Sequence, residues 1–127
     1  MKVSSSYRMR RVNEAIREII GVALTQELKD PRIGFVTLTG VDTAPDLSHA
    51  KVYYSVYGKQ AEKKATLEGL VAARSYLQKR IGDELHLKRI PNLEFTYDAT
   101  VDQGMRIDAL LRSKTVLPEL KEEESES

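Results

Sequence analysis

Residues 28–38 read Leu-Lys-Asp-Pro-Arg-Ile-Gly-Phe-Val-Thr-Leu, and this stretch decides the fold because it turns a helix into a strand. The ring of Pro31 disfavours the α conformation at Asp30, so the preceding helix must end there. The residues from Ile33 to Val41 include many strand formers and carry no helical stripe, which predicts a strand. Helix–turn–strand junctions are common in proteins, so this stretch alone indicates no function. The rest of the sequence is needed to predict one.

The segment before this junction predicts one long amphipathic helix. We expect it to start near Tyr7, where the preceding residues Ser4-Ser5-Ser6 offer hydroxyl caps. Apolar residues then recur at three- and four-residue steps as far as Leu28, and basic residues crowd the first turns on the other faces.

The segment after the junction predicts two more strands and two more helical stretches. They are a strand over 50–57, helical residues over 60–81 with Gly82 as the cap, a strand over 93–98 and a last helix over 101–112. Residues 85–90 predict a loop or a weakly paired segment. The fold class is therefore α+β, with a three-stranded sheet that carries the helices on one face.

The helical stretch over 60–81 contains an interruption. Arg74 falls in the middle of its apolar seam, and Gly69 and Ser75 are poor residues for a helix interior. We expect two helical segments with a kink at Ala73, Arg74 and Ser75. The alternative is one continuous helix in which Arg74 extends its cation to solvent.

Charge divides the 127 residues into a single domain over 1–118 and a tail over 119–127. The tail holds five Glu and one Lys, whereas residues 1–118 hold 19 Lys or Arg against 14 Asp or Glu. Such a tail buries almost nothing, so we expect it to be disordered. It either only solubilises the protein or competes with an anionic ligand for the basic domain.

The composition argues against several classes of function. The chain has no cysteine, which excludes disulfides, thiolate metal sites and a cysteine nucleophile. His49 and His86 lie in no triad pattern, and phosphate-loop, zinc and dinucleotide motifs are absent from the sequence. We therefore expect a protein that is not an enzyme and that uses no cofactor or metal. Without a secretory signal or an apolar run of about 18–20 residues, we expect a cytoplasmic protein that enters no membrane.

RNA binding requires cations for phosphates and flat groups for bases, and the domain offers both. Tyr53, Tyr57 and Lys51 share one face of the strand over 50–57, where we expect packing of the tyrosines rather than base stacking. A solvated polar surface is the alternative role for each cation taken alone. The candidate RNA-binding residues are Arg8, Arg10, Arg11, Lys29, Arg32, Arg74, Lys79, Arg80, Lys88, Arg89 and Arg106.

Four pieces of the chain, in this order and spacing, resemble the ribosome-binding factor A family. They are the basic opening at 8–12, the junction at 28–34, Asp-Leu-Ser-His-Ala-Lys-Val-Tyr at 46–53, and Leu-His-Leu-Lys-Arg-Ile-Pro-Asn-Leu-Glu-Phe at 85–95, followed by Asp98, Gly104, Arg106 and Ile107. The resemblance implies a type II KH-like fold. KH domains use a Gly-x-x-Gly loop, which this chain lacks. The family replaces it with an Ala-x-Gly kink, and here the matching residues are Ala73, Arg74 and Ser75.

The resemblance also implies a function. It implies a monomeric assembly factor that binds the immature 30S ribosomal subunit and its 16S rRNA. It further implies support of late 16S rRNA processing and of growth in the cold, and release with the help of a GTPase. The alternatives are a generic RNA-binding chaperone without ribosome specificity and a protein-interaction module whose basic face meets an acidic protein.

Overall fold

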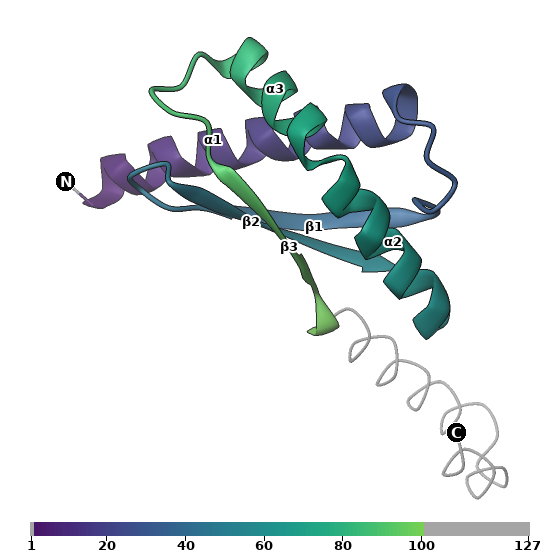
Figure 1. Cartoon of the computed structure of the whole chain (residues 1–127). Coiled ribbons are helices and arrows are strands. Elements are labelled where there is room, and N and C mark those ends of the chain that lie inside the picture. The colour runs from purple at the N-terminus through teal and green to yellow at the C-terminus, as the bar shows by residue number, and fades with distance from the viewer. Residues whose placement is uncertain (1, 101–127) are drawn as a thin grey trace, which may run out of the picture. The chain divides into compact units, whose positions relative to one another are not determined.

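The protein is represented by a computed structural model that describes residues 2–100 (Figure 1). The chain divides into a compact unit over Met1–Tyr97 and a second unit over Asp98–Ser127. All the helices and strands below belong to the first unit. The helix expected over 101–112, the domain end at 118 and the tail over 119–127 lie outside the described residues.

The first helix is longer at its beginning and shorter at its end than expected. α1 spans Lys2–Val22 and continues as a π-helical turn over Ala23–Glu27, so the three serines lie within the helix rather than before it. The wide turn closes when the Leu28 N–H donates to the Ala23 carbonyl at 2.9 Å, and Leu28 is extended. The helix therefore ends three residues before Asp30, whose side chain instead accepts the Arg32 backbone N–H at 2.9 Å and shapes the turn.

Three strands form one sheet with β2 in the centre. β1 spans Val36–Thr43, β2 His49–Val56 and β3 Asn92–Tyr97. β1 and β2 are antiparallel, as a short connection requires, whereas β3 runs parallel to β2 after a helical crossover. β1 begins later than the expected Ile33, because that residue belongs to the turn.

The second helical stretch is divided, as expected, and the division lies at Ala73. α2 spans Gln60–Ala72 and α3 spans Arg74–Leu85, and Ala73 between them has φ −87° and ψ −3°. The expected cap at Gly82 is wrong, since α3 continues to Leu85 and ends at the left-handed His86. Gly82 instead leaves space for Ile90, whose Cδ1 lies 2.5 Å from the position of a Cβ at residue 82.

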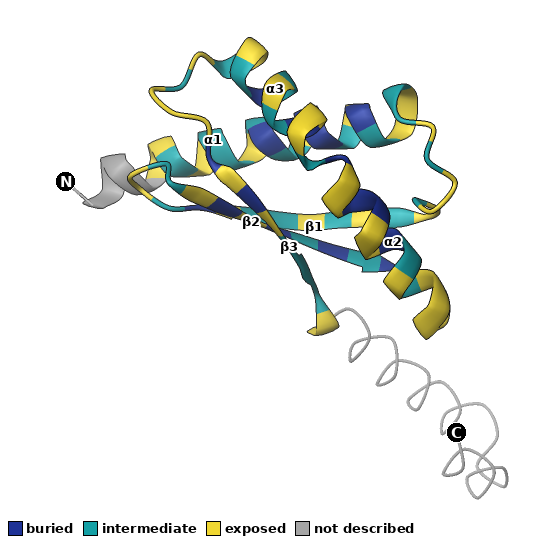
Figure 2. Cartoon of the chain, viewed as in Figure 1, coloured by how far each residue is buried: buried dark blue, intermediate teal, exposed yellow. Residues whose placement is uncertain are grey.

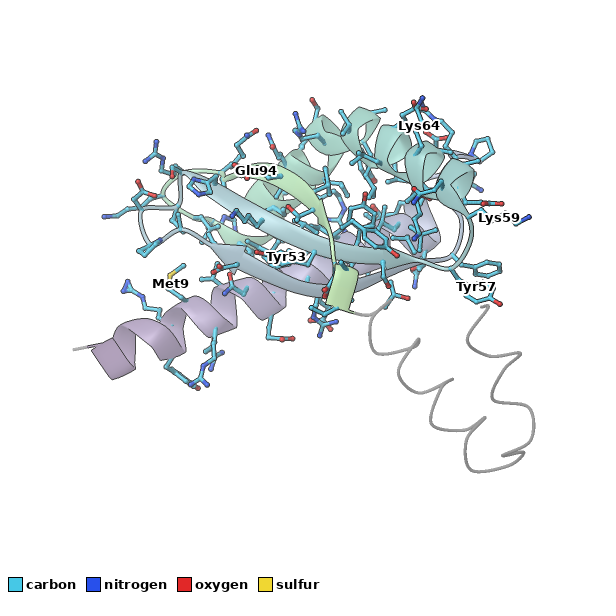
Figure 3. All side chains as sticks on the ribbon, turned by 90° about the horizontal axis from the view of Figure 1, so that it is seen from below. Met9, Tyr53, Tyr57, Lys59, Lys64 and Glu94 are labelled. Atoms are coloured by element: carbon cyan, nitrogen blue, oxygen red, sulfur yellow. The ribbon has the colours of Figure 1, made fainter. Side chains whose placement is uncertain are left out.

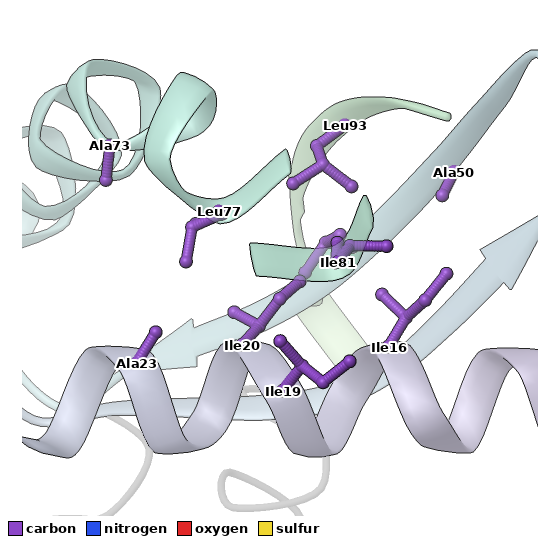
Figure 4. Packing of buried hydrophobic residues seen from close by; sticks show 10 residues of the cluster. Ile16, Ile19, Ile20, Ala23, Ala50, Ala73, Leu77, Ile81 and Leu93 are labelled. Carbon is purple, nitrogen blue, oxygen red and sulfur yellow. The ribbon is translucent and has the colours of Figure 1, made fainter. Parts of the chain in front are cut away.

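The helices cover one face of the sheet, and the core lies between the two layers (Figure 2). β2 alternates accordingly, with Ala50, Val52, Tyr54 and Val56 buried against the helices. The largest core cluster joins α1, α3 and the sheet through Ile16, Ile20, Leu77, Ile81 and Leu93, all fully buried (Figure 4).

The opposite face of β2 is more open than expected. Lys51 is exposed, Tyr53 is half-buried, and Tyr57, just beyond the strand, is 81% exposed. The expected packing of Tyr57 is therefore wrong, because no helix of the described unit covers its ring (Figure 3).

None of the described helices is long and apolar enough to cross a membrane.

Two helical glycines provide a test of the packing between the junction and α2. A Cβ at Gly69 would lie 2.6 Å from Cγ1 of Ile33, whereas a Cβ at Gly21 would meet nothing within 4 Å. Alanine gains about 1 kcal/mol over glycine in a helix, but overpacking costs about 1–3 kcal/mol. We expect Gly69→Ala to lower the free energy of unfolding by about 1 kcal/mol and Gly21→Ala to raise it by up to about 1 kcal/mol.

Guanidinium denaturation of both variants beside the wild type measures this difference. A Gly69→Ala protein as stable as the wild type would contradict the close packing of Ile33 on α2.

Candidate nucleic-acid interface

Three segments that are distant in sequence form a groove at one end of the sheet. They are the beginning of α1, the β1–β2 connection and the connection from α3 to β3, which lie at the same end of the unit (Figure 1). The groove has a volume of about 640 Å³. We call it the basic groove; its lining residues are Arg8, Met9, Val12, Pro45, Asp46, Leu47, His86, Leu87, Lys88 and Arg89.

Hydrogen bonds hold the two connecting loops against each other. The Asn92 N–H donates to the Ser48 carbonyl at 3.1 Å, and Arg89 Nη1 donates to the Asp46 carbonyl at 3.3 Å. Leu47 and His86 line the groove with φ of 63° and 52°, and they are the positive-φ residues other than glycine among those described. Left-handed residues of this kind are uncommon, so both loops are held in specific conformations.

The basic groove combines a cationic rim with an apolar floor. Arg8, Lys88 and Arg89 supply three cations against the single carboxylate of Asp46. Hydrogen bonds that Ser48 donates to the Asp46 carboxylate are the main reason why the pKa of Asp46 lies below its usual value. This carboxylate is therefore ionised at neutral pH. The excess of cations beside Met9, Val12 and Leu87 suits a ligand with phosphates and flat apolar rings.

Three of the predicted RNA-binding cations have carboxylate partners within the fold. Asp30 accepts from Arg32 at 2.6 Å, and Asp83 accepts from Lys79 at 3.2 Å. Arg80 joins α3 to the turn after α1 by donating to both oxygens of Glu27, at 3.0 and 3.1 Å. These partners reduce the charge that the three cations present to a ligand.

The remaining predicted cations are dispersed. Arg74 begins α3 directly after the kink residue Ala73, and its Nε is enclosed without a hydrogen-bond partner in the described structure; Ser75 beside it is exposed. Arg11 donates to the Tyr7 hydroxyl at 3.1 Å. Arg10 and Lys29 are exposed, and Arg106 lies outside the described residues.

The structure brings three of the predicted residues together in one groove. Arg8, Lys88 and Arg89 converge in the basic groove, whereas Arg74 lies at the kink and Lys29 and Arg32 lie at the turn. The sequence reasoning missed the apolar floor of the groove, because Met9, Leu47 and Leu87 resemble ordinary core residues in sequence. Within residues 2–100, the structure holds no group of three His, Asp or Glu side chains that suits a metal ion.

The comparisons with known proteins identify the family. An α+β unit with strand order β1-β2-β3, helices on one face and a helix broken at Ala73 defines a KH-like domain. The family model of ribosome-binding factor A matches residues 8–111. The chain belongs to the ribosome-binding factor A family.

Relatives and solved structures agree with this assignment. Ribosome-binding factor A of Geotalea uraniireducens is 47% identical over 105 residues, which cover 83% of this chain and 86% of the relative. The solution structure of a Thermotoga maritima protein, described as a putative ribosome binding factor A, aligns with TM-score 0.65 and 33% identity over 72% of this chain and 87% of that one. A Thermus thermophilus ribosome-binding factor A model, fitted into the cryo-EM map of a 30S complex, aligns with TM-score 0.56 and 23% identity over 68% of this chain and 91% of that one.

The Glu27–Arg80 ion pair predicts a pH dependence of stability. Hydrogen bonds from Arg80 and then from Tyr76 hold the pKa of Glu27 below its ordinary value of 4.5. A carboxyl with a lower pKa in the folded state stabilises the fold fully above its ordinary pKa, and this contribution is lost as the pH falls through the lowered value. We expect the difference in Tm between the wild type and Glu27→Gln to be largest near neutral pH and to shrink below pH 4.5.

Thermal unfolding from about pH 7 to pH 3 measures this effect. Glu94→Gln is the matched control, because Glu94 is exposed on β3 and has no ion pair to any described residue. A pH-independent difference for Glu27→Gln would contradict an ionised Glu27 beside Arg80.

Proposed function

We propose that this protein is a ribosome-assembly factor that binds the immature 30S subunit through its 16S rRNA. The observation that carries the proposal is the convergence of Arg8, Lys88 and Arg89 around a groove with an apolar floor. Membership of the ribosome-binding factor A family supports the choice of the ribosome as the partner. The Thermus thermophilus relative fitted into a 30S complex supports the choice of the small subunit.

The proposed mechanism is electrostatic docking followed by holding one RNA segment in a fixed conformation. Arg8, Lys88 and Arg89 contact phosphates, and the two bonded loops give the groove a fixed shape. Nothing in this mechanism requires a covalent step, so the protein acts by binding and not as an enzyme. The proposal extends to support of late 16S rRNA processing by a cytoplasmic monomer, and to release of the factor by a GTPase once maturation is complete.

Sedimentation with purified ribosomal particles tests the proposal. The protein is incubated with 30S, 50S and 70S particles and pelleted through a cushion at near-physiological salt. We expect selective co-sedimentation with 30S. Equal binding to all particles would instead indicate a generic RNA binder, and partners that survive RNase digestion would indicate a protein-interaction module.

Charge reversal locates the interface on the protein. We expect Arg8→Glu and Lys88→Glu each to weaken 30S binding and to reduce the salt dependence, since each phosphate contact contributes about 0.7–0.9 log units of affinity per log unit of salt. Lys64→Glu is the matched control, because it makes the same charge change at an exposed residue of α2, at the other end of the unit from Met9 (Figure 3).

Binding measured at several salt concentrations gives both quantities. If Lys64→Glu weakened binding as much as Lys88→Glu, the basic groove would not be the interface.

A further inference from the structure

Two aromatic rings are exposed at the other end of the sheet from the basic groove. Phe35 is 86% exposed and Tyr57 is 81% exposed, the highest values among the large hydrophobic residues described. Phe35 directly precedes β1 and Tyr57 directly follows β2, at the end of the ladder where Val36 pairs with Val56. The two rings are therefore brought to the same corner by the antiparallel register and not by the sequence.

The local backbone turns Phe35 away from the core. The Val36 N–H donates to the Gly34 carbonyl at 2.9 Å, which makes a tight turn at Phe35 just before the strand begins. Val36 and Val56 beside the rings pack toward the core cluster under α2, so the two valines, not the rings, supply the apolar burial at this corner. Neither ring is needed to complete the core.

A groove of about 320 Å³ runs beside both rings. Pro31, Arg32, Glu62 and Thr66 line it together with Phe35 and Tyr57. Its volume lies at the lower limit of about 300 Å³ for sites that hold small ligands, so it suits a flat ring system rather than a helix or strand of a partner protein.

An exposed lysine beside the two rings suits an anionic ligand with flat rings. Arg32 lines the groove, but its guanidinium is paired with Asp30 at 2.6 Å. The cation at this corner that can meet an anionic ligand is therefore the exposed Lys59, which extends from the same corner as Tyr57 (Figure 3). The carboxylate of Glu62 is directed to the backbone, where it accepts the Lys59 N–H at 2.7 Å. Cations beside exposed aromatic faces are the features by which proteins bind single-stranded RNA without base pairing.

We propose that Phe35 and Tyr57 form a stacking site for unpaired nucleobases of RNA, separate from the basic groove. This inference rests on the proposed function in taking RNA as the ligand, but it adds a second contact of a different physical kind. The basic groove binds phosphates, whereas the two rings bind bases through their faces. Each ring contributes about ten-fold in affinity, within the range measured for base–aromatic stacking.

Ring replacement distinguishes stacking from simple apolar contact. We expect Phe35→Leu and Tyr57→Leu each to weaken binding to poly(U) and to 30S subunits about ten-fold, whereas Tyr57→Phe keeps the affinity. The slope of log affinity against log salt should not change, because stacking releases no counterions. Val71→Ala, which shortens an exposed apolar side chain on α2, is the matched control.

A fluorescent reporter tests the contact directly. The chain contains no tryptophan, so Phe35→Trp introduces a single indole at the site. We expect poly(U) to quench its emission and an RNA duplex of equal length to leave it unchanged. Because residue 35 is exposed, the variant keeps the fold, which far-UV circular dichroism checks.

The outcomes separate this inference from the proposed function. Failure of the wild type to co-sediment with 30S subunits would overturn the proposed function, whereas quenching by poly(U) would still support the stacking site. If the wild type binds 30S subunits but the leucine variants bind equally well and the indole of Phe35→Trp is not quenched, the stacking site is overturned. Loss of 30S binding in the leucine variants without any loss toward poly(U) would also overturn it, in favour of a contact with a ribosomal protein.

Discussion

The parallel pairing of β3 with β2 is the constraint on which the basic groove depends. The register begins with His49 opposite Asn92, so the residues that precede the two strands lie at the same end of the sheet. The loop that carries Lys88 and Arg89 is thereby placed beside the β1–β2 connection and the beginning of α1. An antiparallel β3 would carry the same loop to the opposite end, and the three cations would not meet. The helical crossover through α2 and α3 is what makes the parallel direction possible.

The fold uses some of its cations and leaves others for a ligand. Arg80 is bound by Glu27 and Glu84 and joins α3 to the end of the first helix, so its main role in the described structure is cohesion of the helical layer. Arg8 and Lys88 have no such carboxylate partners among residues 2–100 and lie on the rim of a groove. This division is more informative than the net charge of +1, because affinity for RNA depends on cations that are free to meet phosphates.

β2 connects the basic groove to the corner that carries the exposed rings of Phe35 and Tyr57. Its eight residues span roughly 25 Å at the usual rise of a strand, with the basic groove near His49 and the exposed rings beyond Val56. A central strand paired on both sides holds this separation rigidly. An RNA segment that engaged both ends would therefore be held at two points a fixed distance apart, which is a physical means of keeping one conformation. The break at Ala73 lies between the helices that cover this strand, and it allows α2 and α3 to pack on the sheet at different angles.

The sequence by itself determined the elements within residues 2–100, their order, the break in the second helix and the family. These features follow from the spacing of apolar residues, from the backbone preferences of Asp30 and Pro31 at the turn, and from short sequence motifs. All of these act over a few residues. The sequence predicted the helix ends less accurately. The π-helical turn before Leu28 and the left-handed residue His86 at the end of α3 depend on tertiary packing, which local sequence does not specify.

Only the tertiary structure decided which candidate residues meet. Glu27 and Arg80 are 53 positions apart, and Arg8 and Lys88 reach one groove only through the parallel register of β3. The exposure of Phe35 and Tyr57 could not be predicted from the sequence either, because an aromatic residue beside a strand has the same local sequence pattern whether its ring packs or faces solvent. Local periodicity specifies the face of an element, but the partner of that face is chosen by contacts between distant segments of the chain.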